Sequence, residues 1–374
     1  MTRPELKPLT SVRGLFAWGV VLFHLRLACA GWLPEGVVHA LGKGYLAVDF
    51  FFLLSGFVIQ LNYGEPLATG GRKEAADFLV RRIARVWPLH AVMLGFAAGL
   101  AILLLATGRP APHFPFALLP LHLAMMQDWG FSRALLWNDP AWSISCEWAA
   151  YLLTPLAAWA IGRRAGWPAW ALAIAAALPL LLLFGVMTAA GANGLGYDIA
   201  HLGIVRCLTE FACGTLLCDL WRRWRGNARA EMAAWGFGAA MLAGWAAGLP
   251  ETLAAPFAFA GLLLGLALGS ERPRHPLAAG WIHYLGEISY ATYLSHFLLF
   301  FAFKLAFVHD AHAVRPSLIA AFLLFEVAAS AALYHGVERP AQKAIRRWWS
   351  GKRPSGGEPA ANPLPAIPRE AEAG

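Results

Sequence analysis

Ten apolar stretches, each about 20 residues long, limit what this chain can fold into more than any other feature of its sequence. A helix of about that length crosses the hydrocarbon of a lipid bilayer. Hydrophobic residues make up 59% of the chain and charged residues only 14%, a balance unlike that of soluble domains. The sequence therefore predicts an all-α, multi-pass membrane protein with spans at 9–30, 45–62, 87–107, 141–161, 167–189, 201–221, 232–249, 253–270, 286–307 and 315–337.

The Lys and Arg residues between the spans indicate the topology, because cytoplasmic loops carry the excess of these residues. An eleventh apolar stretch, residues 116–127, is short for a crossing. If it does not cross, most loop Lys and Arg residues share one side with both termini, and the other side has only Lys43, Arg109 and Arg133. We therefore expect a bundle of ten transmembrane helices, cytoplasmic termini, and an outer loop at 108–140 with a re-entrant or interfacial piece.

The chain divides into two parts by composition. Residues 1–345 hold all of the apolar stretches and are predicted to form one membrane-embedded domain. Residues 346–374 are rich in Pro, Gly and charged residues, which bury too little apolar surface to form a packed core. We expect this segment to be a disordered cytoplasmic tail.

Charge and motif content exclude several classes of function. The net charge of +8 is spread over the connections between spans and forms no single patch, which favours membrane topology over nucleic-acid binding. The five cysteines show no metal-ligand spacing and predict no metal site. The sequence also has no Walker loop, GxSxG elbow or HExxH pair.

The first span contains Arg13 and His24, which share one face of a helix and lie about 16 Å apart along its axis. Ionisable side chains in hydrocarbon are costly and are therefore functional candidates. With the N-terminus inside, Arg13 lies near the cytoplasmic surface and His24 in the outer half of the membrane. His24 is predicted to be a general base, because imidazole exchanges protons near neutral pH; a hydrogen bond that only packs helices is the alternative.

Two carboxylates lie at a depth where they could meet His24. Glu147 falls roughly 10 Å below the outer surface and His24 about 9 Å below it, counted along their helices. Asp49 lies four residues into the second span and can reach a similar layer. We therefore predict Glu147 and Asp49 as catalytic partners of His24, one of which orients its imidazole.

Other polar residues within the spans are candidates for binding substrate. Arg206 and Glu210 are four residues apart and predict an intrahelical ion pair, with a structural role and a substrate-binding role both open. His296 is interpreted first as a hydrogen-bonded packing residue. The candidate substrate-binding residues are Trp142, Ser143, Arg206, Glu210, Tyr290 and His296.

Three arginines, Arg81, Arg82 and Arg85, follow one another on an amphipathic turn of a cytoplasmic connection. Guanidinium groups bind phosphates through two parallel hydrogen bonds. Acidic membrane lipid explains the same residues equally well.

Five motifs together resemble acyltransferase family 3, whose members are integral membrane acyltransferases. In order, the matching segments are 9–15 (LTSVRGL) leading to His24, 48–59 (VDFFFLLSGFVI), 81–85 (RRIAR), 142–147 (WSISCE) and 285–296 (LGEISYATYLSH). The resemblance covers roughly residues 9 to 340. We expect the stand-alone type, without the C-terminal esterase-like domain that some members carry.

The resemblance implies a fold, a reaction and a set of site residues. It implies ten core helices in a bacterial inner membrane and O-acetylation of a cell-envelope polysaccharide or similar acceptor. The donor would be acetyl-CoA or another acyl-CoA from the cytoplasm, and the acceptor a hydroxyl of a glycan or lipid-linked saccharide. By match, Arg13 and His24 correspond to the family's Arg and His pair, Arg81, Arg82 and Arg85 to its cytoplasmic arginine motif, and Glu147 to the Glu of its Trp-Ser motif.

The mechanism expected from these residues has the arginines holding the donor's phosphates while the thioester reaches His24. His24 would remove the proton of the acceptor hydroxyl. A covalent acyl intermediate on His24, Ser143 or Cys146 stays open beside direct transfer. A proton-coupled membrane transporter is the alternative function, because His, Asp and Glu within spans also form proton relays.

Overall fold

The computed structural model describes residues 6–162, 164, 166–270, 272, 275–308 and 314–351. Over these residues the chain is helical and has no β-strand. The α-helices are α1 Lys7–Leu25, α2 Glu35–Leu41, α3 Ala47–Thr69, α4 Arg72–Ala106, α5 Leu119–Leu123, α6 Ala141–Ile161, α7 Ala169–Ala189, α8 Ile199–Trp224, α9 Ala228–Ala246, α10 Glu251–Gly269, α11 Gly280–Glu287, α12 Ser289–Phe307, α13 Pro316–Leu333 and α14 Arg339–Gly351. Short helical turns, η1 Arg26–Cys29, η2 Gly42–Leu46, η3 Phe116–Leu118, η4 Pro276–Ala278 and η5 Tyr334–Glu338, connect some of them.

Nine helical segments within the described ranges are long and apolar enough to cross a membrane. They correspond to nine of the ten predicted spans. The tenth prediction, 232–249, falls on α9, a helix of 19 residues. Its first turns contain Arg229 and Glu231, and it is not among the segments that are long and apolar enough to cross a membrane. The all-α, multi-pass architecture is confirmed.

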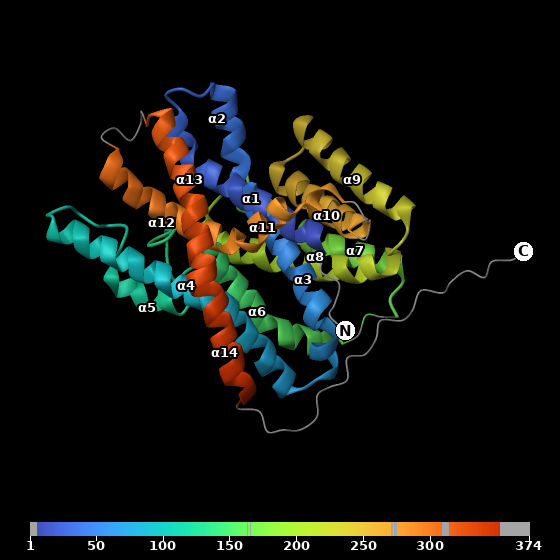
Figure 1. The fold of residues 1–374 in the computed structure, drawn as a ribbon. Helices are drawn as coiled ribbons and strands as arrows, with labels where there is room; N and C mark the ends of the chain where they lie inside the picture. Colours follow the sequence, from blue (N-terminus) through green and yellow to red (C-terminus); the bar gives the residue numbers. More distant parts are fainter. Residues whose placement is uncertain are drawn as a thin grey trace, which may run out of the picture.

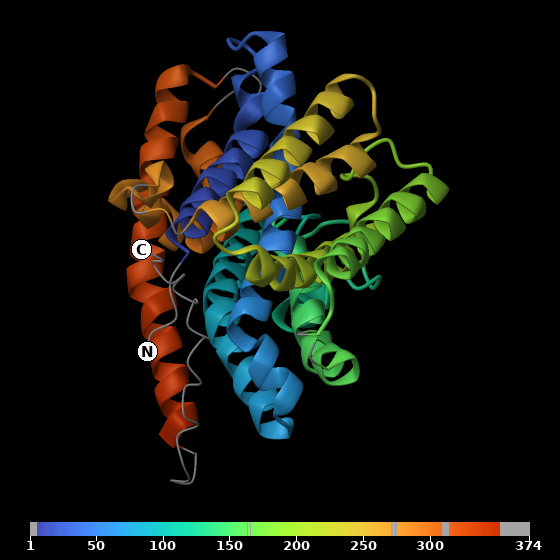
Figure 2. The ribbon, with the colours of Figure 1, turned by 90° about the vertical axis from the view of Figure 1, so that its right-hand side faces the viewer.

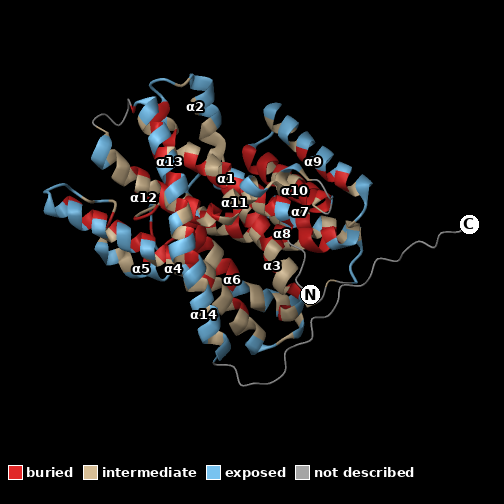
Figure 3. Cartoon of the chain, viewed as in Figure 1, coloured by how far each residue is buried: buried red, intermediate tan, exposed pale blue. Residues whose placement is uncertain are grey.

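The lipid-facing surface and the interior differ as expected for a protein in a bilayer. Buried residues concentrate along the centre of the bundle and exposed residues on the outward faces (Figure 3). On α7 the exposed side chains include Ile174, Leu178 and Leu182, each more than half exposed. Large apolar side chains on an outer surface cost nothing when the solvent is hydrocarbon.

The segment Pro316–Gly351 and helix α4 are both longer than a bilayer alone requires. The segment Pro316–Gly351 joins α13, η5 and α14 in 36 residues, and at 1.5 Å per residue it is about 54 Å long. It forms a continuous rod along one side of the molecule (Figures 1 and 2). α4 has 35 residues and a similar length. Since the hydrocarbon is about 30 Å thick, both helices extend beyond it.

The ninth predicted span, 286–307, is bent. α11 ends at Glu287 and α12 begins at Ser289, so the helix axis changes at Ile288. α1 packs closely at this bend, because Gly14 and Gly286 have no side chain and their backbones approach each other. Any Cβ at Gly286 would overlap the backbone of Thr10. This contact places Arg13 beside the broken helix.

The loop 108–140, predicted to be an outer loop, folds into the bundle. Within it, the stretch predicted not to cross forms only η3 and the five-residue α5, which confirms that it is no full span. The Trp137 side chain is fully buried, and the amide of Asn138 donates to the Leu294 carbonyl at 2.8 Å. The loop is therefore held against α12.

The predicted tail begins as a helix. Residues 346–351 form the end of α14, so the boundary predicted at residue 346 was too early. Residues 352–374 lie outside the described residues, and the disorder of the tail stays a prediction. The cytoplasmic location of the two termini also stays a prediction.

Candidate active site

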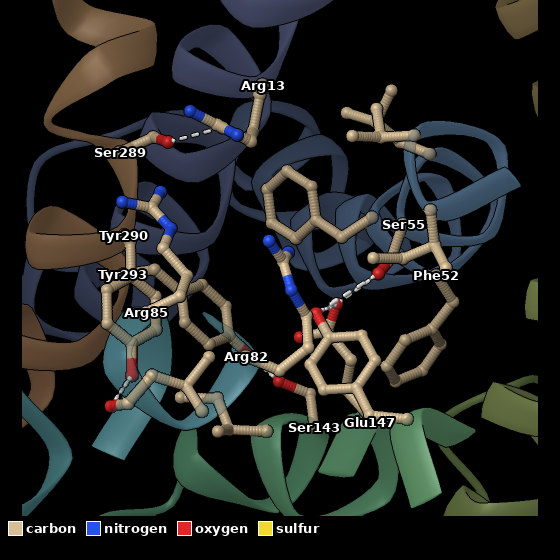
Figure 4. A pocket seen from close by; sticks show the side chains of 17 residues that line it. Arg13, Phe52, Ser55, Arg82, Arg85, Ser143, Glu147, Ser289, Tyr290 and Tyr293 are labelled. Atoms are coloured by element: carbon tan, nitrogen blue, oxygen red, sulfur yellow. Dashed lines mark hydrogen bonds between the residues drawn. The ribbon is translucent and has the colours of Figure 1, made fainter. Parts of the chain in front are cut away.

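A cavity of about 160 Å³ lies between α1, α3, α4, α6 and α12. Its polar lining comes from three arginines, one carboxylate, three tyrosines and three serines (Figure 4). These residues are Arg13, Arg82 and Arg85; Glu147; Tyr151, Tyr290 and Tyr293; and Ser55, Ser143 and Ser289. The remaining lining is apolar. Such a mixture of an apolar wall with a few convergent polar groups is typical of ligand sites.

Arg13 reaches the cavity from α1 and donates hydrogen bonds to the bend between α11 and α12. Its Nε donates to Ser289 Oγ at 2.8 Å, and its Nη2 donates to the Gly286 carbonyl at 2.7 Å. That carbonyl belongs to the end of α11, where helical carbonyls lack partners within the helix. Arg13 therefore joins the two half-helices and presents its positive charge to the cavity.

Arg82 and Arg85 approach the same space from α4. Arg85 forms an ion pair with Glu338 of η5 and lies over the Tyr290 ring at 5.4 Å. Arg82 donates to the Tyr63 hydroxyl at 3.1 Å, while its buried Nε has no hydrogen-bond partner in the part of the chain that the structure describes. Three guanidinium groups thus face one another, with Glu147 and Glu338 as the nearby carboxylates.

Arg81 is the predicted phosphate-binding residue that the cavity does not contain. It forms an ion pair with Asp77 of the same helix at 2.9 Å and is 40% exposed. Arg81 and Arg85 are four residues apart, so their side chain directions differ by about 40° around the helix. The packing of neighbouring helices determines which of the two faces the cavity. The arginine set of the cavity is Arg13, Arg82 and Arg85.

Glu147 lies on the cavity wall, where two hydroxyls hold its carboxylate. Oε1 accepts hydrogen bonds from Tyr151 at 2.5 Å and from Ser55. The structure records no contact between Glu147 and His24, so the prediction that Glu147 orients the imidazole was wrong. The depth estimate places two residues in one layer but does not determine the direction of their side chains.

Asp49 is also not a partner of His24. The prediction that Asp49 orients the imidazole was therefore wrong as well. Both carboxylate oxygens of Asp49 accept hydrogen bonds from Arg206, from Nε and Nη2, each at 2.5 Å. Asp49 is fully buried and Arg206 is 1% exposed. This bidentate pair connects α3 to α8 inside the bundle.

The predicted intrahelical pair of Arg206 with Glu210 does not form. Arg206 pairs with Asp49 instead, and neither oxygen of the fully buried Glu210 has a hydrogen-bond partner among the residues described. Trp142 lies over the Arg206 guanidinium at 5.4 Å. None of these three predicted substrate-binding residues lines the cavity. They form a buried cluster that packs α3, α6 and α8 together, and their role in substrate binding stays a prediction.

The residue next to His24 is His296, whose predicted role was substrate binding or packing. Their ring centroids are 5.1 Å apart. His296 Nδ1 lies 3.0 Å from the Thr292 carbonyl, and its buried Nε2 has no partner within the described ranges. Phe297 covers the other side of His24, with ring centroids 5.3 Å apart. α12 thus contributes two side chains to the surroundings of His24.

Tyr293 stands between the cavity and this histidine pair. It lines the cavity, and its ring centroid is 6.2 Å from that of His296. Its hydroxyl lies 2.8 Å from Ser143 Oγ and donates to the Pro140 carbonyl at 3.0 Å, so two contacts hold it to the start of α6. His24 itself does not line the cavity.

Comparison with known proteins gives the family. The family described as an acyltransferase domain matches residues 9–335, most of the chain. The chain belongs to acyltransferase family 3. The resemblance found in the motifs is therefore confirmed, and family membership favours a transferase over the transporter considered above.

Two curated proteins are similar to this family member. The acyltransferase MdmB of Streptomyces mycarofaciens is 26% identical over 400 residues, which cover 98% of each chain. Protein 2 in the picA locus of Rhizobium radiobacter is 36% identical over 118 residues, 28% of this chain and 61% of that protein. No solved structure matches the chain. The protein is therefore a multi-pass membrane acyltransferase.

Several site residues of this acyltransferase were not singled out from the sequence. Ser55 and Tyr293 lie inside the quoted motifs, and Tyr151 is one helical turn after Glu147, so position could have indicated them. Glu338 lies just beyond the last predicted span. Glu326 was missed although it is a carboxylate within that span; it accepts hydrogen bonds from Ser295 at 2.7 Å and Ser330 at 3.2 Å.

The outer loop contributes a further titratable pair near the histidines of this family member. His113 Nε2 lies 3.0 Å from Asp139 Oδ1, and the His113 ring is 6.1 Å from that of Phe297. Asp128 in the same loop is buried. Burial, together with the nearby charge of Asp139, raises the pKa of Asp128 to about 7.

Proposed function

We propose that this acyltransferase moves an acyl group, in the first place acetyl, from cytoplasmic acyl-CoA to a hydroxyl of a glycan or lipid-linked saccharide. The proposal includes a location in the bacterial inner membrane and a product in the cell envelope. The observation that carries it is the cavity in which Arg13, Arg82 and Arg85 converge next to the His24–His296 pair.

The charge of the cavity favours an anionic donor. Three guanidinium groups face one carboxylate on the lining, Glu147, and one more, Glu338, pairs with Arg85 from outside it. A net positive charge in a low-dielectric site favours an anion. Phosphate accepts the paired hydrogen bonds that guanidinium offers. An acyl-CoA supplies phosphates at one end and a thioester at the other.

The size of the cavity decides how much of the donor enters. Its volume of about 160 Å³ is below the roughly 300–1,000 Å³ of sites that enclose a drug-sized ligand. The cavity therefore takes part of the donor, and the nucleotide stays at the entrance. We place the arm that carries the thioester in the cavity, directed past Tyr293 toward His24.

His24 is the proposed general base, and His296 the proposed positioning residue. A carbonyl only accepts hydrogen bonds, so the contact with Thr292 favours the His296 tautomer with hydrogen on Nδ1. Nε2 of His296 can then accept a hydrogen bond from a ring N–H of His24. The second ring nitrogen of His24 keeps its lone pair and is free to accept a proton.

The proposed chemistry is a direct transfer. The acceptor oxygen attacks the thioester carbonyl carbon while His24 takes the hydroxyl proton. The carbon–sulfur bond then breaks, the CoA thiolate leaves, and the proton passes from His24 to that sulfur. Of the alternative nucleophiles, Cys146 is fully buried and does not line the cavity, whereas Ser143 lines it. A covalent step on His24 or Ser143 therefore stays open.

The experiment that tests the function compares His24→Ala with His201→Ala in full-length purified protein. His201 is 48% exposed, pairs with Asp198 and does not line the cavity, which makes it a matched control. We expect wild type and His201→Ala to release CoA from acetyl-CoA, and His24→Ala to lose at least 100-fold in rate, in line with the usual contribution of a general base. Normal turnover by a folded His24→Ala protein would refute the role of His24.

A second experiment addresses the acceptor. Mass spectrometry of surface glycans from a deletion strain, with and without the restored gene, should show an acyl mass that depends on the protein. If only small metabolites change, the glycan acceptor is wrong while the transferase assignment remains.

A further inference from the structure

α4 and α14 form an antiparallel pair at the end of the molecule where both helices extend beyond the hydrocarbon. Two contacts define their register. Arg85 of α4 pairs with Glu338 at the end of η5, and Asp77 of α4 accepts a hydrogen bond from Trp349 Nε1 of α14 at 3.1 Å. Between these contacts α4 advances by eight residues and α14 by eleven in the opposite direction.

This register places Arg346 of α14 opposite Arg81 and Arg82. At 100° per residue, Glu338, Arg346 and Trp349 point to one side of the helix, within about 80° of one another. Arg346 lies between the two contacts on that side, and its electrostatic neighbours are Tyr63, Arg81 and Arg82. Arg347 points about 100° further around the helix, away from α4.

The resulting cluster has more positive than negative charge. Asp77 contributes a carboxylate to the cluster. Its Oδ2 accepts a hydrogen bond from Arg81 and its Oδ1 accepts one from Trp349. α14 carries Arg339, Lys343, Arg346 and Arg347 and no acidic residue. Arg346 is exposed and Arg81 is 40% exposed, so an anion from the aqueous side can reach both. Like charges held together by a fixed helix pair repel unless an anion binds between them.

We propose that Arg81 and Arg346 form a second anion subsite, at the entrance of the arginine-lined cavity, for the phosphorylated nucleotide end of the donor. The inference rests on the proposed function, because it takes the cavity as the site of the donor's arm. Arg82 is common to both places, since it lines the cavity and lies near Arg346. The subsite selects a thioester carried on a nucleotide over the same thioester on a shorter phosphopantetheine arm.

The test measures binding of coenzyme A and of 4′-phosphopantetheine to the full chain by calorimetry, without an acceptor. It uses phosphatidylcholine nanodiscs with and without phosphatidylglycerol. We expect Arg346→Ala to weaken coenzyme A binding about fivefold to tenfold, the size of one partly exposed charge-assisted hydrogen bond. Binding of 4′-phosphopantetheine should not change. Arg347→Ala removes the same charge from the opposite face and should change neither, and Arg346→Lys should recover part of the loss.

Three results would overturn the inference. The first is an equal effect of Arg346→Ala and Arg347→Ala, which would mean a general charge effect. The second is the same loss for both ligands. The third is a loss that occurs only in nanodiscs that contain phosphatidylglycerol, which would assign Arg346 to acidic lipid headgroups. If the wild-type protein binds coenzyme A in none of these conditions, the proposed function fails together with the inference.

Discussion

The pair Asp49–Arg206 offers the sharpest test of how this membrane protein holds its buried charges. We expect Asp49→Asn to destabilise the protein by about 3 kcal/mol, because breaking a buried ion pair by removing one partner costs about 3–5 kcal/mol. Arg206 donates two hydrogen bonds to Asp49, each at 2.5 Å. A hydrogen bond to a charged group contributes about 1.5–3 kcal/mol to stability. The lower end of the range applies because the carboxyl group of Glu210, fully buried near Arg206, remains in place.

Glu210→Gln is the matched control, and we expect little or no loss of stability. Glu210 makes no hydrogen bond over the ranges that the structure describes, and Arg206 already has a bidentate partner. Replacing this carboxyl with an amide of similar size leaves the Asp49–Arg206 pair in place. We expect a change of less than about 1 kcal/mol, or a small gain in stability.

The assay is reversible unfolding in mixed micelles of increasing SDS content, followed by tryptophan fluorescence. Asp49→Asn should shift the midpoint to lower SDS, and Glu210→Gln should leave it in place. CoA release per folded molecule should be retained in both variants, because Asp49 does not touch His24. If Asp49→Asn unfolds like wild type, or if it is stable but inactive, the structural role assigned to Asp49 is wrong.

Three further predictions concern the cavity and the outer loop. Arg82→Ala should weaken binding of coenzyme A at least tenfold in calorimetry, because it removes a cavity guanidinium whose Nε has no partner among the residues described. An unchanged affinity would contradict the proposed donor site. Tyr293→Phe removes the hydroxyl that contacts Ser143 and Pro140. The rate of acyl-CoA hydrolysis without acceptor should then rise about fivefold, as expected for a loss of about 1 kcal/mol. An unchanged rate would show that Tyr293 does not separate the cavity from His24. The raised pKa of Asp128, about 7, favours the protonated carboxyl in the folded loop, so loop stability is complete below about pH 4 and falls as pH rises through 7. Hydrogen exchange in residues 108–140, corrected for intrinsic rates, should therefore increase from pH 5 to pH 8 in wild type and not in Asp128→Asn.

The helices were largely predictable, and the partners of the ionisable residues were not. Nine of the ten predicted spans fall on helical segments apolar enough to cross a membrane, because each is a local stretch of apolar residues. The arginines and serines of the cavity lie in motifs that the sequence displays. Arg81 shows the limit: it is in the same motif as Arg82 and Arg85, yet it does not line the cavity and pairs with Asp77. A motif defines which residue types are present, and the packing of α4 decides which of them face inward.

The sequence by itself determined that this protein is helical, crosses a membrane many times and belongs to acyltransferase family 3, because apolar run length and motif order are properties of neighbouring residues. Only the tertiary structure decided the charge pairs. Asp49 and Arg206 are 157 positions apart, and Arg85 and Glu338 are 253 apart. Such pairs depend on the rotation and tilt of each helix against its neighbours, which are set by contacts such as that of Gly14 with Gly286. Depth along one helix determines the layer of a side chain, but the direction in which it points is determined by the other helices.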